Sequence, residues 1–253
     1  MSHSNDFNKD NIDIYLNDFA EEYKKLNNDK KLLKIVLVGG AAILLNYNFR
    51  KSTNDIDYSN PQSELINEAI EKTAEKHRLF KNWLNNDFRK TSAYSDKINE
   101  ISIPYKQISD ILEIRTISSE YLIVMKLMAF RNNKHDLSDV AGILMENKEN
   151  GKPLNIENIK NAAVTLYGNI NKLPNESLIM LNNLFEKNDF KNDYLYLKKR
   201  EEAVRDKYKE LKKENRFEAE ILDHNALLSK ATNKINNKLE EYDDILLDKR
   251  KKV

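Results

Sequence analysis

LVGGAAILLNYNFRKSTNDIDY, residues 37–58, is the most informative stretch of this chain. It overlaps the segment 32–38, whose short, apolar and partly β-branched composition predicts a buried strand. The pair Gly39-Gly40 ends that strand, and the apolar residues 41–47 predict a helix directly after it. A polar turn then leads into residues 55–58, where we expect a second strand.

Two features of this stretch suit phosphate and metal chemistry. Glycines have no side chain, so the backbone N–H groups of Gly39 and Gly40 could approach a phosphate at the positive end of the helix. Asp55 and Asp57 are one residue apart in the expected strand, so both carboxylates lie on one face while Ile56 faces the core. Two such carboxylates repel each other unless a cation lies between them, and Mg²⁺ prefers oxygen ligands and phosphate partners.

The rest of the first 150 residues predicts a mixed α/β arrangement. With only 5 Gly, 4 Pro and 33% charged residues, the composition favours helix. Further strands are expected at 101–104 and 111–117, and helices at 11–26, 63–77, 119–131 and 137–146. Ser118 and Asp136 are placed as N-caps of the last two helices.

Strand signals stop after residue 150, and the remainder predicts only helices. Helices are expected at 156–166, at 176–186 and at 226–247, with a long charged helix before the last of these. In the long helix Leu197, Val204 and Leu211 recur every seven residues, and Glu201 interrupts their apolar seam. The fold class is therefore α+β, with one domain over residues 1–150 and a helical domain over 151–253.

Composition excludes several classes of protein. The chain has no Cys, which excludes disulfides, zinc-thiolate sites and a thiol nucleophile. The 42 basic and 41 acidic residues give a net charge of +1, which lacks the basic excess of a dedicated nucleic-acid-binding domain. No apolar run reaches the roughly 18 residues of a membrane span, and the polar start does not resemble a signal peptide. We therefore expect a cytoplasmic protein with no membrane partner.

The order of the motifs resembles the nucleotidyltransferase superfamily, which has the DNA-polymerase-β-like fold, and within it the bacterial branch of AbiEii-type toxins and their relatives. Thr53 precedes the Asp pair as in that branch's R-x-[ST]-x-D-I-D pattern, although Lys51 stands where Arg is usual and Arg50 lies beside it. Residues 83–87 (WLNND) resemble a W-L-N element of some relatives, and residues 126–139 (KLMAFRNNKHDLSD) resemble K-x-x-A-x-R followed by D-x-x-D. The resemblance covers about residues 30–145.

The resemblance implies a small mixed sheet flanked by helices and transfer of a nucleoside monophosphate from a nucleoside triphosphate with Mg²⁺ as cofactor. The nucleotide-binding residues it implies are Gly39, Gly40, Thr53 and Lys126. The catalytic residues it implies are Asp55, Asp57, Lys126 and Asp136, of which Asp55 and Asp57 would hold the metal ions. A third metal carboxylate is expected in this superfamily, and the sequence offers Glu100, Asp110 and Glu113 without choosing between them.

Several alternatives stay open at this point. The acceptor could be a hydroxyl of tRNA or of a protein, or a small molecule, and a toxin would have a cognate antitoxin as partner. Lys126 lies among apolar residues, so a surface lysine with a buried stem is the alternative to a phosphate ligand. The spacing of Asp136 and Asp139 also fits a simple helix start. The unassigned third carboxylate and Lys51 allow a non-enzymatic helical interaction protein with a degenerate nucleotidyltransferase domain.

Overall fold

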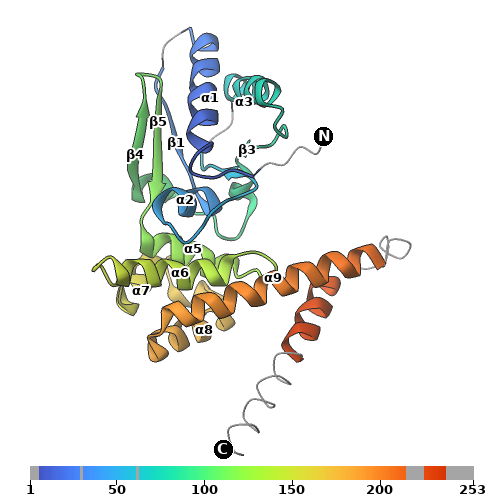
Figure 1. Ribbon diagram of the computed structural model, residues 1–253. Helices are drawn as coiled ribbons and strands as arrows, with labels where there is room; N and C mark the ends of the chain where they lie inside the picture. Colours follow the sequence, from blue (N-terminus) through green and yellow to red (C-terminus); the bar gives the residue numbers. More distant parts are fainter. Residues whose placement is uncertain (1–5, 29–30, 61–62, 215–224, 238–253) are drawn as a thin grey trace, which may run out of the picture.

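The computed structural model describes residues 6–28, 31–60, 63–214 and 225–237. In chain order its elements are α1 (Ile12–Leu26), β1 (Leu33–Val36), α2 (Gly39–Asn46), β2 (Ile56–Asp57), α3 (Glu64–His77), β3 (Leu84–Asn85), the 3-10 helix η1 (Asp87–Lys90), α4 (Ile98–Ile101), β4 (Ser102–Ile108), β5 (Leu112–Ile117), α5 (Ser119–Ala129), α6 (Asp136–Glu149), α7 (Ile156–Tyr167), η2 (Ile170–Lys172), α8 (Asn175–Lys187) and α9 (Phe190–Glu214). Residues 225–237 are also helical. Figure 1 shows the strands with α1, α2 and α3 in one lobe, and α5 to α9 in a second lobe beneath it. The α+β class expected from the sequence is confirmed.

The sheet is small and mixed. β5 lies between β1, to which it is parallel, and β4, to which it is antiparallel. β2 and β3 form a second, parallel pair, in which Ile56 is opposite Leu84 and Asp57 is opposite Asn85. The backbone N–H of Val38 donates to the carbonyl oxygen of Asp57 over 2.9 Å, so the chain just after β1 is bonded to β2, which carries Asp57 and directly follows Asp55.

Both faces of the chain over residues 35–38, at the end of β1 and just after it, are covered, which explains the unbroken apolar sequence of this segment. Ile35 and Leu37 belong to one apolar cluster, together with buried residues of α1, α3 and β5. Val36 and Val38 belong to a second cluster, which contains the buried faces of α5, α6, α7 and α8. Because successive strand residues point to opposite faces, a strand buried on both sides shows no alternation of polar and apolar residues.

The second apolar cluster includes residues on both sides of residue 150, from Val36 to Phe190. The domain division near residue 150 stays a prediction. The predicted seam of α9 is divided between two clusters: Val204 and Leu211 pack with Leu227 of the helix over 225–237, while Leu197 packs against the second cluster. Residues 238–247 of the last expected helix lie outside the described residues. Among the described residues, no helix combines the length and the apolar composition that crossing a bilayer requires.

The two expected helix caps need correction. Ser118 does occupy the N-cap position of α5, but its hydroxyl contacts the Glu120 carboxylate over 2.8 Å and caps no backbone N–H. Asp136 is the first residue of α6 and not its cap, because His135 holds the N-cap position. The carboxylate of Asp136 binds the cations Lys126 and Arg131 instead, and this competing interaction could not be inferred from local spacing.

A substitution at Gly142 in α6 tests how closely this helix packs against the turn after α2. A Cβ at Gly142 would lie 2.6 Å from the Phe49 ring, which itself packs against Tyr47 and Tyr194. We expect Gly142→Ala to lower the free energy of unfolding by up to about 2 kcal/mol, since an overpacking cost of about 1–3 kcal/mol is offset by a gain in helix propensity of about 1 kcal/mol. Urea denaturation measures the change. The double variant Gly142→Ala/Phe49→Leu should recover part of the loss, and strict additivity would contradict the assigned contact.

Candidate active site

The glycine pair is required by close contacts on two sides. Gly39 has a left-handed backbone, with φ +59°, and a Cβ there would lie 3.2 Å from Oδ2 of Asp57. A Cβ at Gly40 would lie 2.5 Å from the Thr53 hydroxyl and 3.1 Å from Nη2 of Arg50. Only glycines therefore allow the first turn of α2 to fit between the Asp57 carboxylate and the polar turn that precedes β2.

A cavity of about 310 Å³ lies beside this turn. Its lining includes four residues that the sequence analysis assigned to the site, which are Gly39, Asp55, Asp57 and Lys126. Among the lining residues that it did not assign to the site are Asn85, Asp87, Met125 and Arg131. Three predicted site residues do not line this cavity: Gly40, Thr53 and Asp136. Gly40 and Thr53 are close to each other beside the glycine turn, and Asp136 accepts a hydrogen bond from the lining residue Lys126.

The surroundings of Asp57 disfavour the ionised form of its carboxyl group. Burial, and then the neighbouring charge of Asp55, raise the pKa of Asp57 to about 6, although Lys126 and Arg131 act in the opposite direction. Asp55 is exposed and lines the same cavity. A cation between the two carboxylates would relieve both effects, as burial and like-charge repulsion each oppose ionisation.

The donor set fits Mg²⁺ in the way this ion usually binds proteins. Mg²⁺ commonly takes one or two carboxylates and completes its shell with water and substrate phosphates. Asp55 and Asp57 supply the two carboxylates. In the described part of the chain, no group of three or more His, Cys, Asp or Glu side chains is arranged to hold a metal. The remaining ligands of such an ion would therefore come from water and from a phosphorylated substrate.

Behind the cavity, five charged side chains alternate in sign, and we call them the charge chain. Nζ of Lys126 lies 2.8 Å from Oδ1 of Asp136 and 2.8 Å from Oδ2 of Asp139. Nε of Arg131 lies 2.8 Å from Oδ2 of Asp136, and Nη1 of Arg50 lies 2.7 Å from Oδ2 of Asp139. The chain therefore runs from Arg50 through Asp139, Lys126 and Asp136 to Arg131. Asp136 is completely buried.

The charge chain keeps Lys126 charged. Burial alone would lower the pKa of Lys126, but Asp136 and Asp139 raise it above its ordinary value. The lysine is 8% exposed and its ammonium ends inside the protein, so the alternative of a surface lysine with a buried stem is wrong. Three cations against two anions leave the charge chain with one positive charge in excess, and Lys126 and Arg131 bring positive charge to the cavity that contains the two aspartates.

The structure places two groups that the expected pattern left open. Arg50, and not Lys51, makes the buried ion pair with Asp139. Lys51 is exposed. Asp87, which the sequence analysis did not name as a candidate metal carboxylate, lines the cavity together with Asp55 and Asp57.

None of the three expected candidates for a third carboxylate lines this cavity. Glu113 forms an ion pair with Lys34 on β1. The side chain of Asp110 is 78% exposed to solvent. Asp87 had a local signal: it is the last residue of WLNND, two residues after Asn85, which pairs with Asp57. That signal needs the pairing of β2 with β3, which the sequence does not reveal.

Glu201 lies next to the charge chain, whereas the sequence analysis interpreted it only as an interruption of the apolar seam of α9. Its carboxylate, on α9, is completely buried and accepts hydrogen bonds from the backbone N–H groups of Leu137 (2.7 Å) and Ser138 (3.2 Å). Burial raises the pKa of Glu201 to about 8. These bonds satisfy free N–H groups at the start of α6, the helix that carries Asp136 and Asp139.

Comparison with known protein families gives a match over most of the chain. The model of a protein family described as "Nucleotidyltransferase of unknown function (DUF6036)" matches residues 15–202 of the chain. The matched residues include the cavity, the charge chain and Glu201. No curated protein and no solved structure matches the chain significantly.

Asp57→Asn should stabilise the protein in the absence of divalent metal. Its pKa of about 6, against 3.8 in an unperturbed carboxyl, means that the ionised side chain destabilises the folded state at pH 8. Removing the charge should raise the free energy of unfolding by about 1–3 kcal/mol. Thermal denaturation in EDTA measures the change. Asp110→Asn, which removes an exposed carboxylate, is the control and should leave the melting temperature unchanged; a loss of stability in Asp57→Asn would contradict the assigned repulsion.

Glu201 should make stability fall as the pH rises above neutrality. Its folded pKa of about 8 exceeds the unfolded value of 4.5, so its contribution is complete below pH 4.5 and is lost as the pH rises through 8. Burial lowers the pKa of His135 to about 4, and this group affects stability only below pH 6.5. We therefore expect the free energy of unfolding to fall between pH 6.5 and 9, and Glu201→Gln to remove that slope. Equal slopes in both proteins would refute the assignment.

Proposed function

The chain belongs to a family of nucleotidyltransferases of unknown function, and from this membership we propose that it moves a nucleoside monophosphate from a nucleoside triphosphate to an acceptor hydroxyl, with Mg²⁺ as cofactor. The observation that supports this most directly is one cavity bordered by the glycine turn, two like-charged carboxylates and two cations. A triphosphate carries the negative charge, and Mg²⁺ the positive charge, that these groups require.

Five of the lining residues have a task in this proposal. The backbone of Gly39, at the N-terminus of α2, faces the phosphates with N–H groups at the positive end of the helix. Lys126 and Arg131 neutralise the triphosphate. Asp55 and Asp57 would hold Mg²⁺, which stabilises the charge on the transferring and leaving oxygens when bound.

The proposed reaction is a displacement at the α-phosphorus. The acceptor oxygen forms a bond to this phosphorus, the bond to the bridging oxygen of the β-phosphate breaks, and pyrophosphate leaves with the bonding electrons. The acceptor hydroxyl gives up its proton to water as the new bond forms. Lys126 and Arg131 are positioned to offset the charge of the pyrophosphate.

Asp136, Gly40 and Thr53 act through other residues in this proposal. Asp136 is completely buried and reaches the cavity only through Lys126 and Arg131, so we assign it a positioning task. Gly40 and Thr53 are in close contact and fix the first turn of α2.

The resemblance to AbiEii-type toxins extends the proposal to the acceptor. We propose a hydroxyl of tRNA or of a protein as acceptor, and the toxin of a type IV toxin–antitoxin system as the biological role, with a cognate antitoxin as partner. A cytoplasmic location accompanies this proposal, because nucleoside triphosphates and tRNA are found there.

The contacts around the cavity favour the enzyme over the non-enzymatic alternative. Arg50, beside Lys51, makes a buried ion pair with Asp139. Asp87 brings a third carboxylate to the cavity, although the described residues hold no group of three acidic or histidine side chains arranged to bind one metal ion. A degenerate domain would not be expected to keep the close glycine contacts and a complete charge chain together, so the enzyme is the better interpretation.

Incubation with each α-³²P-labelled triphosphate, Mg²⁺ and cell extract tests the proposal. We expect label to enter RNA or protein, and Asp57→Asn to reduce the rate on the order of 10²-fold or more, since lost electrostatic stabilisers have effects of this size. Asp110→Asn is the matched control, as it removes a carboxylate outside the cavity, and should keep full activity.

Calorimetry of triphosphate binding provides a readout that needs no acceptor. An enzyme should bind a triphosphate more tightly with Mg²⁺ than without, and Asp55→Ala should abolish this difference. Full transfer activity in a folded Asp57→Asn protein would refute the proposal. Absence of any triphosphate binding by the wild-type chain would favour the interaction protein.

A further inference from the structure

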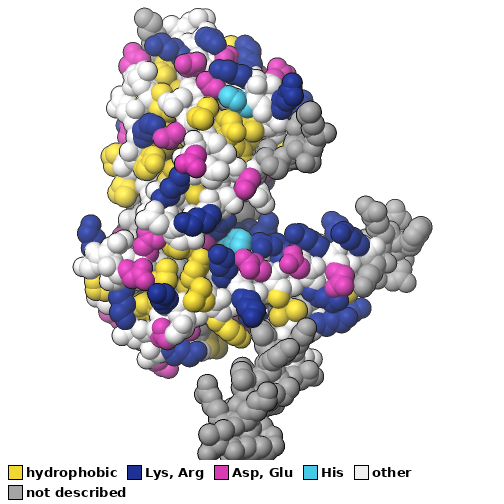
Figure 2. Space-filling view, in the orientation of Figure 1, with side chains coloured by type: hydrophobic (Ala, Val, Ile, Leu, Met, Phe, Trp, Pro, Cys, Tyr) yellow, Lys and Arg dark blue, Asp and Glu magenta, His cyan; other side chains and the backbone are white. Residues whose placement is uncertain are grey.

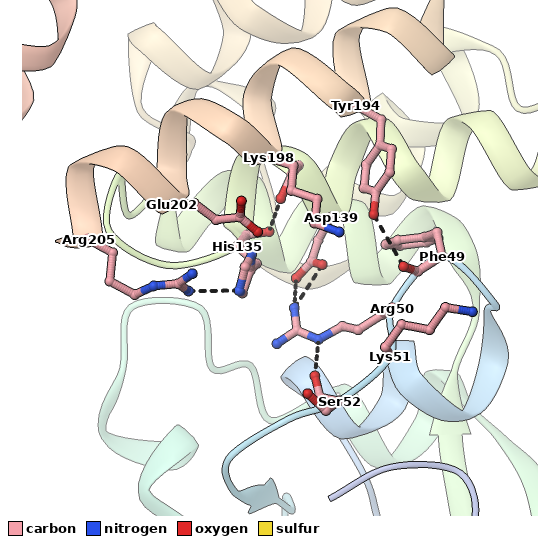
Figure 3. Close-up of a pocket in the computed structure, with 11 residues that line it drawn as sticks. Phe49, Arg50, Lys51, Ser52, His135, Asp139, Tyr194, Lys198, Glu202 and Arg205 are labelled. Carbon is pink, nitrogen blue, oxygen red and sulfur yellow. Dashed lines mark hydrogen bonds and ion pairs between the residues drawn. The ribbon is translucent and has the colours of Figure 1, made fainter. Parts of the chain in front are cut away.

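A second cavity, of about 190 Å³, lies on the other side of the charge chain. It is enclosed by the turn of residues 49–52, the start of α6 and one side of α9 (Figure 3). Arg50 and Asp139, which belong to the charge chain, line this second cavity, whereas Lys126 and Arg131 line the first. One layer of ion pairs therefore separates the two cavities.

Positive charge predominates in the second cavity. Its basic lining residues are Arg50, Lys51, Lys198 and Arg205, and its acidic ones are Asp139 and Glu202. Asp139 is already compensated by two cations of the charge chain. Within the described part of the protein, Lys51, Lys198 and Arg205 make no ion pair with a carboxylate. Glu202 is then the one lining carboxylate that opposes three such cations.

The two arginines keep hydrogen-bond donors available. Arg50 uses Nε on the Ser52 carbonyl oxygen and Nη1 on Asp139, and its Nη2 has no acceptor among the described residues. Nη1 of Arg205 lies 2.9 Å from Nε2 of His135. Burial, and then the charge of Arg50, lower the pKa of His135 to about 4, so the imidazole is neutral and accepts this bond. The other donors of Arg205 have no partner within the described ranges.

The surface around the cavity extends this pattern. Figure 2 shows a hollow between the sheet lobe and α9, with Lys and Arg side chains along it and Asp and Glu side chains among them. Lys198 lies 5.6 Å from the centre of the Tyr194 ring, which fixes its stem against α9. Several separated donors around a small concave space suit a tetrahedral phosphate, which accepts hydrogen bonds from several directions, better than a planar carboxylate.

We propose that the second cavity binds a phosphate group of a nucleic-acid acceptor strand, so that an RNA and not a protein receives the nucleotide. This inference rests on the proposed function for its biological meaning. A strand whose terminal hydroxyl enters the first cavity carries further phosphates along its backbone, and the second cavity lies directly across the charge chain. A protein acceptor has no such repeating phosphate. The predominance of positive charge is therefore explained by an RNA substrate.

Binding of a short fluorescein-labelled single-stranded oligoribonucleotide, followed by fluorescence anisotropy, tests the proposal on the full chain. We expect the double variant Lys198→Gln/Arg205→Gln to weaken binding by tenfold or more and to make the affinity less dependent on salt, because fewer counterions are released. Lys199→Gln, which alters an exposed neighbour on α9 that does not line the cavity, is the matched control and should bind as the wild type does.

Glu202→Gln gives an effect of opposite sign. It removes the opposing carboxylate of the cavity and should tighten oligonucleotide binding by a factor of a few, which general unfolding cannot mimic. Equal affinity of the wild type, the double variant and Glu202→Gln would overturn the proposal, as would failure of the wild type to bind the oligonucleotide. If the protein binds inorganic phosphate but does not bind the oligonucleotide, the ligand of the cavity is a free phosphate and the proposal of a nucleic-acid ligand is refuted.

The same experiments separate this inference from the proposed function. Asp57→Asn should abolish the Mg²⁺-dependent gain in triphosphate binding, whereas Lys198→Gln/Arg205→Gln should weaken oligonucleotide binding and keep that gain, because neither Lys198 nor Arg205 lines the first cavity. If triphosphate binding fails while the oligonucleotide responds to the cavity variants as expected, only the proposed function is refuted. If triphosphate is transferred while the cavity variants bind and react normally, only the phosphate site is refuted.

Discussion

A buried layer of alternating charges is the interaction on which the rest of this structure depends. Each charge in it would be strongly unfavourable alone, because transfer of an ion from water to the protein interior is opposed by several kcal/mol even after relaxation. Lys126 is acceptable at its position since Asp136 and Asp139 both contact it, and Arg50 and Arg131 complete the contacts of these aspartates. The layer is stable as a whole and would leave an uncompensated charge if any member were removed.

α6 is the element that this constraint places at the centre of the molecule. Its first turn supplies Asp136 and Asp139 to the charge chain, and Glu146 near its end accepts hydrogen bonds from the backbone N–H groups of Asn48 and Phe49. Glu201 of α9 holds the start of the helix. The polar turn that precedes the two aspartates is therefore fixed from the helical lobe, so the C-terminal helices contribute to the geometry of the cavity.

Local patterns predicted the longer elements and part of the site, and they missed short ones such as β3, η1 and α4. The glycine pair, the strand that contains Asp57 and most of the longer helices follow from patterns within a few residues, and the structure places Gly39 and both aspartates at one cavity. Asp87 and Glu201 were missed for another reason. The first joins the site through the pairing of two-residue strands, and the second by contact of α9 with the start of a helix 63 residues earlier. Nothing near either residue in the sequence encodes these contacts.

The charge chain and the pair Asp55 and Asp57 lie next to each other, and they differ in whether each carboxylate contacts a cation. In the charge chain every carboxylate contacts a cation, which is what a structural cluster needs. Asp55 and Asp57, by contrast, face a cavity, and the second of them has a pKa raised by burial and by its neighbour. If the pair only stabilised the fold, replacement of one aspartate by asparagine would remove this repulsion without loss of packing. Under the proposed function, a bound cation would supply the positive charge that this carboxylate pair lacks, and strain of this kind is typical of sites where a bound partner completes the structure.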